Sequence, residues 1–169
     1  MTALRPFVFR RYIDFGVIAS LRSMKAGISA EVRRRGLQGD VKLGHGGIRE
    51  VEFIAQCFQL IRGGRDRDLQ QRELLPVLAE CVKLGCLPAQ DAAGLRAAYL
   101  FLRDSEHAIQ GYQDKQTQEL PVDELPRLAM ATVMGFASWP EFCAELERRR
   151  AMVAGHFAGL IAAPEEPSR

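Results

Sequence analysis

The stretch KLGHGGIREVEFIAQCFQLIRGGR, residues 42–65, contains a turn, a helix and a helix stop in direct succession. Three of the four residues 44–47 are glycines, which allow the backbone to turn sharply and another group to approach closely. Apolar residues then recur every three or four positions as far as Ile61, which is the spacing of an amphipathic helix. Gly63 and Gly64 are suited to its end. The stretch therefore predicts a helix that begins at Gly46 or Gly47 and ends near Arg62.

The same helical period continues on both sides of this stretch, and no segment alternates convincingly between apolar and polar residues. Glycines 36, 85 and 135 are suited to helix ends, whereas Asp123 and the S-x-x-E pair at 138 and 141 are suited to helix starts. Further helices are predicted over residues 6–35 (as one or two helices), 69–84, 88–112, 124–134 and 138–160. We therefore expect an all-α bundle of about six helices, with one domain over residues 1–163 and a tail or linker over 164–169.

The composition is that of an ordinary globular protein. Of 169 residues, 47% are hydrophobic and 26% are charged, which argues against disorder. The net charge is only +2, but residues 1–75 hold 14 basic against 8 acidic side chains. This basic half either faces phosphate or an acidic partner, or is a solvated surface of uneven composition. Because the excess is modest beside that of a dedicated nucleic-acid binder, we expect no nucleic acid among the partners.

The cysteines and the hydropathy pattern predict a cytoplasmic protein. Cys57, Cys81, Cys86 and Cys143 show no paired C-x-x-C spacing, which favours reduced, mostly buried thiols over a zinc site or a disulfide framework. Charged residues interrupt the N-terminal stretch, so no secretory signal is predicted. No run of about 18 uncharged apolar residues is present, so we expect no membrane contact.

The glycines before the helix at 46–62 form the first candidate site. Free N–H groups at a helix start attract anions, so one interpretation is a phosphate site, and the other is a simple turn into the helix. The spacing matches neither a P-loop nor a dinucleotide fingerprint.

Glu50 is the second unusual feature of this segment. At about 100° per residue, Arg49 and Glu52 share a polar stripe, whereas Glu50 lies between the positions of Cys57 and Ile61. Because an isolated buried charge is costly, its carboxylate is expected to meet a neighbouring domain, a metal ion or an arginine. The alternative is a glutamate exposed in the first helical turn, where the helix dipole favours it.

Three further pairs of charged residues stand out, and the first has both a functional and a structural interpretation. Arg62 and Arg65 flank two glycines, where they contact phosphate or a partner, or where Arg62 helps to cap the helix. Arg103 and Glu106 lie one helical turn apart, which predicts a pair within one helix. Asp66 and Asp68 form a D-x-D by spelling but follow a helix, and we interpret them as a solvated loop.

Trp139 and His45 complete the residues that stand out. Trp139 lies beside the predicted helix start at Ser138 and is expected to be a core anchor. A lone histidine such as His45 is more often structural or solvent-facing than catalytic, so it is given no proton-transfer role.

Several motifs resemble those of one protein family. The run LGHGGIREVEFIAQCFQLIRGGR (43–65) resembles a signature of the glutamine synthetase adenylyltransferase/deadenylylase family. RPFVFRRYID (5–14), AYLFLRDSE (98–106), DKQTQELP (114–121) and SWPEF (138–142) are also similar to that family and occur in its order. In that family two nucleotidyltransferase halves are joined, and each catalytic domain is followed by a helical domain that the uridylyltransferase of the PII protein shares.

The resemblance implies a helical domain of the N-terminal, deadenylylating half, which uses phosphate to remove AMP from a tyrosine of glutamine synthetase. Glutamine synthetase, the PII signalling protein and the missing nucleotidyltransferase domain are then the implied partners. The full-length enzyme would use Mg²⁺ and a nucleotide or phosphate, but no Gly-Ser and D-x-D strand pair is found here. We therefore expect this fragment alone to be inactive and to bind none of these cofactors.

The resemblance also suggests which residues line the cleft of the full-length enzyme. These candidates are Lys42, Gly46, Gly47, Arg49, Glu50 and Glu52. Glu50 is the only metal candidate in the fragment. Two alternatives remain for the whole chain, a binding module for the PII protein and a spacer between domains.

Overall fold

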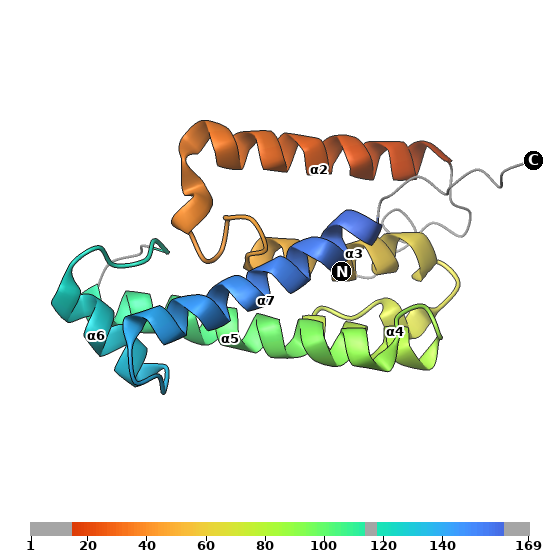
Figure 1. Ribbon diagram of the computed structural model, residues 1–169. Coiled ribbons are helices and arrows are strands. Elements are labelled where there is room, and N and C mark those ends of the chain that lie inside the picture. Colours follow the sequence, from red (N-terminus) through yellow and green to blue (C-terminus); the bar gives the residue numbers. More distant parts are fainter. Residues whose placement is uncertain (1–14, 114–117, 161–169) are drawn as a thin grey trace, which may run out of the picture.

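A computed structural model describes residues 15–113 and 118–160, and the described part is an all-α bundle (Figure 1). It contains no strand, only an isolated antiparallel bridge between Asp40 and Glu119. Two short 3₁₀ turns, η2 and η3, lie at Leu37–Gly39 and Arg67–Leu69. The helices are α2 (Phe15–Arg35), α3 (Ile48–Arg62), α4 (Leu74–Lys83), α5 (Ala89–Gln113), α6 (Glu124–Val133) and α7 (Trp139–Leu160).

Helix α3 lies at the centre of the bundle. It packs against α4, α5 and α7, while α5 carries α4 near one end and α6 near the other (Figure 1). The buried positions of α3 include Val51, Ile54 and Phe58, as its apolar spacing predicts. Phe53 and Cys57 are buried as well, so the buried face is wider than one stripe and lets α3 contact several helices at once.

Helix α7 closes the core with a stripe of large side chains. Phe142, Leu146, Val153 and Phe157 are all nearly inaccessible to solvent. Phe142 lies among the rings of three neighbours, with centroid distances of 5.2–5.8 Å; they are Phe101, Phe136 and Trp139. Trp139 is thus the core anchor that its place in the sequence predicts.

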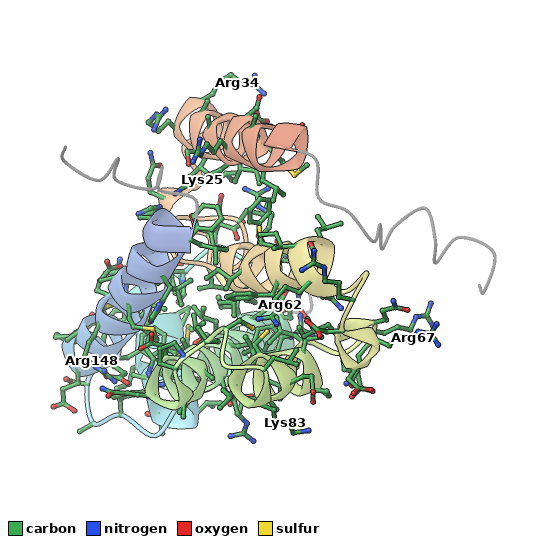
Figure 2. All side chains as sticks on the ribbon, turned by 90° about the vertical axis from the view of Figure 1, so that its right-hand side faces the viewer. Lys25, Arg34, Arg62, Arg67, Lys83 and Arg148 are labelled. Atoms are coloured by element: carbon green, nitrogen blue, oxygen red, sulfur yellow. The ribbon has the colours of Figure 1, made fainter. Side chains whose placement is uncertain are left out.

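Helix α2 forms a separate layer above α3 and α7 (Figure 2). Among the α2 residues whose burial the structure describes, Leu21 and Val32 are the buried apolar ones. The ammonium group of Lys25 donates a hydrogen bond of 3.0 Å to the carbonyl of Phe157 and lies 4.6 Å from the centre of that ring. The connection to α7 is therefore partly electrostatic.

The helix predicted over residues 69–84 is wrong at its start. The helix begins at Leu74, and the chain before it forms a 3₁₀ turn at Arg67–Leu69 that buries Leu69. Pro76 explains the difference, because it lacks an N–H group and fits only the first turn of a helix. A helix that began at residue 69 would place it beyond that turn.

The other predicted helix ends agree with the structure to within two residues. Gly36, Gly85 and Gly135 have φ angles of 67°, 66° and 80°, the left-handed conformation expected after a helix. The Ser138 hydroxyl accepts a hydrogen bond of 3.4 Å from the N–H of Glu141, as the predicted capping box requires. Asp123 occupies the N-cap position of α6 without a side-chain capping bond. The part of the first predicted helix at residues 6–14 lies outside the described residues.

The cysteines are free thiols. Cys57 and Cys81 are buried, and burial raises the pKa of each thiol to about 12, so both are protonated at neutral pH. Cys86 and Cys143 are half-buried. None of the helices within the described ranges is both long and apolar enough to span a bilayer.

Phe142→Ala is expected to lower the free energy of unfolding by about 3–5 kcal/mol, because it leaves a cavity between three aromatic neighbours. Urea denaturation followed by circular dichroism measures the loss. Val133→Ala removes an exposed apolar side chain and should change the free energy by less than about 0.5 kcal/mol. Equal effects of both substitutions would contradict the packing described for α7.

Candidate functional site

The segment between α2 and α3 is a folded turn, which we call the glycine turn (residues 36–47). An Asp40 carboxylate oxygen accepts hydrogen bonds from the N–H groups of Lys42 (2.8 Å) and Leu43 (2.7 Å). The N–H of Val41 donates to the carbonyl of Gln118 at 3.0 Å, which joins the turn to the chain after α5. The turn is therefore fixed by bonds both within itself and to a distant segment.

The first N–H groups of α3 are already occupied. Ile48 donates to the carbonyl of Val41 (3.2 Å), Arg49 to that of Lys42 (3.1 Å) and Glu50 to that of Gly47 (3.0 Å). A phosphate bound at a helix start needs free N–H groups. The backbone geometry therefore favours the simple turn into a helix over a phosphate cradle.

Arg150 of α7 makes two hydrogen bonds to the glycine turn, an arrangement that we call the Arg150 clamp. Its guanidinium donates hydrogen bonds of 2.7 Å to the carbonyls of both His45 and Gln38, and the residue is only 7% exposed. Burial lowers the pKa of the guanidinium, while the carboxylates of Glu147, Glu50 and Asp40 oppose that shift.

Arg150 is not among the residues predicted from the sequence, although the sequence contains one signal of its role. Phe142, Leu146, Arg150, Val153 and Phe157 follow one another at spacings of three or four residues, so the arginine occupies a core position of its helix. A charged residue at such a position needs a polar partner, and the carbonyls of the glycine turn are that partner.

The close approach of α7 explains Gly44 and Gly46, whereas Gly47 lies against carbonyl oxygens of the turn itself. A Cβ atom at Gly46 would lie 2.7 Å from the Cα of Arg150, and the φ angle of Gly46 is 68°. A Cβ atom at Gly47 would lie 2.7 Å from the carbonyl oxygen of Lys42, and one at Gly44 would meet the Arg150 guanidinium. Each position thus excludes a side chain for a steric reason.

Glu50 is buried, with 4% of its surface exposed, so the alternative of an exposed first-turn glutamate is wrong. One carboxylate oxygen lies 3.3 Å from Nδ1 of His45, which is itself largely exposed. The other oxygen, Oε2, has no hydrogen-bond partner. The nearby Arg150 guanidinium contributes favourable electrostatics without a direct ion pair.

Arg49 is incompletely bonded in the same way. One terminal nitrogen donates to the carbonyl of Leu43 at 3.2 Å, but Nε is buried without a partner. Among the side chains that the structure describes, Arg49 Nε and Glu50 Oε2 are the only buried polar atoms in this condition. An unpaired buried polar atom costs about 1–3 kcal/mol, so their position in adjacent residues calls for an explanation.

Lys42 and the predicted pair Arg103 and Glu106 form one cluster. Glu106 is 2% exposed and lies 2.6 Å from Arg103, which confirms that pair. Its second oxygen lies 3.3 Å from the ammonium group of Lys42. Lys42 therefore joins the glycine turn to α5 through a buried carboxylate.

The remaining candidates lie away from the turn. Glu52 lines a separate pocket of about 490 Å³ with Gln56 and Tyr99. Arg62 pairs with Asp66 at 2.9 Å, and this hydrogen bond raises the pKa of its guanidinium. Arg65 is exposed. The structure thus brings together Lys42, Gly46, Gly47, Arg49 and Glu50.

The described side chains do not supply the ligands that a Mg²⁺ site needs. Mg²⁺ takes about six oxygen ligands in proteins. Within residues 15–113 and 118–160, no group of three or more His, Cys, Asp or Glu side chains could hold a metal ion. Glu50 and His45 supply one oxygen and one nitrogen, so this part of the chain does not fit a Mg²⁺ site by itself.

Comparison with known proteins places the chain. A family model described as GlnD PII-uridylyltransferase matches residues 22–161. The chain belongs to this family. It is 54% identical over 167 residues to the bifunctional glutamine synthetase adenylyltransferase/adenylyl-removing enzyme of Hahella chejuensis, and 56% identical over 163 residues to the Pseudomonas aeruginosa protein of the same name. The resemblance drawn from the motifs is confirmed.

The two alignments cover 98% and 96% of the chain, but the chain spans only 17% of the length of each relative. The similarity thus includes the glycine turn and nearly all of the described bundle, while most of each relative has no counterpart in this sequence.

Gly46→Ala is expected to lower the free energy of unfolding by several kcal/mol more than Gly135→Ala. Both glycines have positive φ angles, but a Cβ atom at Gly135 would meet nothing within 4 Å. The left-handed conformation alone costs about 1–2 kcal/mol, so the excess measures the approach of α7. Equal losses in chemical denaturation would show that this approach does not constrain the turn.

Arg150→Met is expected to lower the free energy of unfolding by about 2–4 kcal/mol, because it removes two charged hydrogen bonds and leaves two carbonyls without donors. Amide hydrogen exchange should quicken at Gly44 and Gly47, which are bonded within the turn. Arg148→Met removes an exposed arginine from the same helix and serves as the control, with little effect on exchange. Unchanged exchange in Arg150→Met would contradict the clamp.

Proposed function

We propose that this chain is a helical accessory domain of a glutamine synthetase adenylyltransferase/deadenylylase, and that Arg49 and Glu50 contact the nucleotidyltransferase domain or its bound substrate. The observation that supports this proposal is the pair of unpaired polar atoms, Arg49 Nε and Glu50 Oε2. They occur beside the turn that Arg150 and Asp40 hold by hydrogen bonds and that Lys42 joins to Glu106.

The rigidity of the surroundings supports a functional explanation for the unpaired atoms. A flexible turn could shift to satisfy a donor and an acceptor at little cost. Here the backbone N–H groups at the start of α3 are bonded, and Gly44 and Gly46 lie directly against Arg150 of α7. A rotation of the Arg49 and Glu50 side chains, with the backbone of the turn unchanged, would give both atoms partners from a second domain outside the bundle.

The chemistry of the parent enzyme is assigned to the domain that this sequence lacks. In the proposed reaction, an oxygen of inorganic phosphate attacks the phosphorus of the AMP group, the bond from that phosphorus to the tyrosine oxygen of glutamine synthetase breaks, and ADP and a free tyrosine hydroxyl result. Mg²⁺ held by the catalytic domain would stabilise the phosphate charge. We propose the deadenylylating half as its context from the motif resemblance, and the cytoplasm from the unpaired cysteines. This chain would supply position and hydrogen bonds, and it would carry no activity alone.

The PII protein is proposed as a partner of the parent enzyme on the family resemblance. The spacer alternative is retained for comparison, since it makes the opposite prediction for Arg49 and Glu50. A pure spacer would tolerate their replacement as well as that of any surface residue.

Glu50→Gln and Arg49→Met, made in the full-length relative from Pseudomonas aeruginosa at the aligned positions, are expected to lower adenylyl removal about 10–100-fold. That range corresponds to the loss of one charged hydrogen bond of about 1.5–3 kcal/mol. Glu141→Gln is a matched control, because Glu141 also lies in the first turn of a helix but is exposed.

The same substitutions in the isolated chain should leave the helical circular dichroism signal and the melting temperature nearly unchanged. Full activity of both variants would exclude a contact with the catalytic domain and favour the spacer. Loss of activity together with unfolding of the isolated chain would assign the two residues a structural role only.

A further inference from the structure

Helix α6 and the residue before it hold most of the exposed large apolar side chains among the described residues. Six such side chains are substantially exposed, and four of them lie on α6 or directly before it. These four are Val122 (77% exposed), Leu125 (70%), Leu128 (54%) and Val133 (74%). Single exposed apolar residues are ordinary, whereas a group on one short element indicates an interaction surface.

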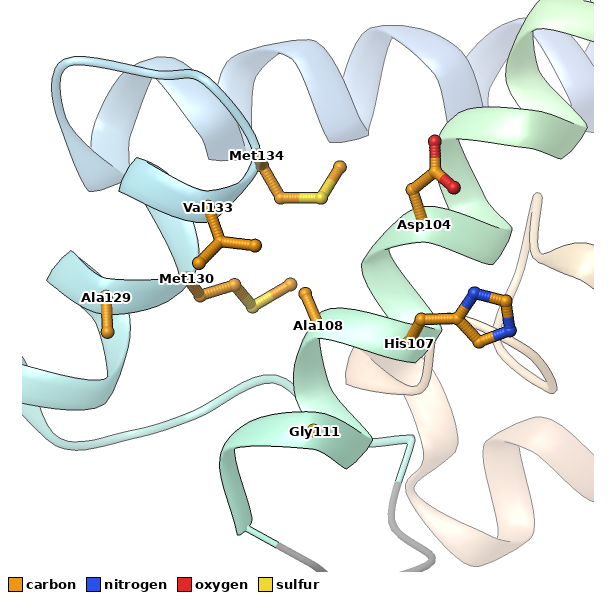
Figure 3. A pocket seen from close by; sticks show the side chains of 8 residues that line it. All are labelled: Asp104, His107, Ala108, Gly111, Ala129, Met130, Val133 and Met134. Carbon is orange, nitrogen blue, oxygen red and sulfur yellow. The ribbon is translucent and has the colours of Figure 1, made fainter.

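A groove adjoins this surface between α5 and α6 (Figure 3). It has a volume of about 630 Å³, and Met130, Met134 and Ala108 line it together with Val133. Methionines suit a surface that accommodates different apolar groups, because their side chains are unbranched and polarizable. The groove therefore extends the apolar surface of α6 into a concave site.

Acidic side chains lie beside both parts of this surface. Asp104 lines the groove on the α5 wall next to His107, and Asp123 and Glu124 are exposed at the start of α6 beside Val122 and Leu125. The basic residue of α6, Arg127, is already engaged, since it donates to the carbonyl of Pro121 at 3.0 Å and lies 5.5 Å from the Trp139 ring. A partner with basic residues beside an apolar face complements this pattern.

The form of the groove decides between a helical and an extended partner. Both walls are helices, whose backbone groups bond internally, so no sheet edge is offered for an added strand. A helix satisfies its own backbone and can insert side chains at three- and four-residue spacing. We propose that the α5–α6 groove and the apolar face of α6 bind an amphipathic helix of a protein partner, with lysine or arginine beside its apolar stripe.

The test uses methionine methyl groups as reporters. Met130 and Met134 line the groove, whereas Met24 on α2 and Met152 on α7 do not. The probe is an 18-residue helical peptide with leucines on one face and lysines on the other, titrated into the chain labelled with ¹³C in its methionine methyls. Saturable shifts are expected at Met130 and Met134, with little change at Met24 and Met152.

Variants of the chain distinguish specific binding at this surface from non-specific binding to exposed apolar residues. Leu125→Asp combined with Leu128→Asp should weaken binding at least about tenfold without unfolding, because both side chains are exposed. Met24→Asp replaces an apolar residue on α2 that is as exposed as Leu128 (54%), and this variant should bind the peptide like the unmodified chain.

Three results would overturn the proposal. Equal binding of a peptide with the same composition in scrambled order would show that no helical stripe is recognised. Equal binding of a peptide with glutamate in place of lysine would remove the charge argument. Concentration-dependent dimers in sedimentation velocity that Leu128→Asp abolishes would assign the surface to a second copy of this chain.

Discussion

The glycine turn depends on the hydrogen bonds that the buried guanidinium of Arg150 donates to it. A cation in a helix core is costly unless polar groups replace water around it. Here the carbonyls of Gln38 and His45 accept its hydrogen bonds, so the turn must lie directly against α7. A side chain at residue 44 would collide with the Arg150 guanidinium and one at residue 46 with the Arg150 backbone, so these two glycines follow from the position of the arginine. Gly47 is required instead by the carbonyl oxygens of the turn.

A buried anion opposes this buried cation on the other side of the turn. Glu106 of α5 binds both Arg103 and Lys42, and Lys42 belongs to the turn. The turn is thus held between a cation of α7 and an anion of α5, each with bonds of defined direction. Glu50 lies in the first turn of the helix that follows, near the Arg150 guanidinium, with one carboxylate oxygen unpaired.

Hydrophobic period and glycine position were sufficient to predict the helices and most of their ends. They failed at residue 69, where the rule for Pro76 had more weight than the apolar pattern. The angle of Glu50 on the helix pointed to burial but left an exposed first-turn glutamate as an equal alternative, which its 4% exposure excludes. The Arg150 clamp depends on contact between residues more than 100 positions apart, and only the charge within the stripe of α7 pointed to it. The Lys42 pairing had no such signal, because a lysine in a turn is normally solvated.

The glycine turn and helix α6 are joined through one short segment of chain. The carbonyl of Gln118 accepts a hydrogen bond from the N–H of Val41, and the carbonyl of Pro121 accepts one from the guanidinium of Arg127 on α6. Each of these bonds is about 3.0 Å long, and the helices on both sides pack into one core, so the two surfaces belong to one packed unit. A domain that contacts Arg49 and a helix that binds α6 would therefore be positioned relative to each other by this bundle, even if neither altered its conformation.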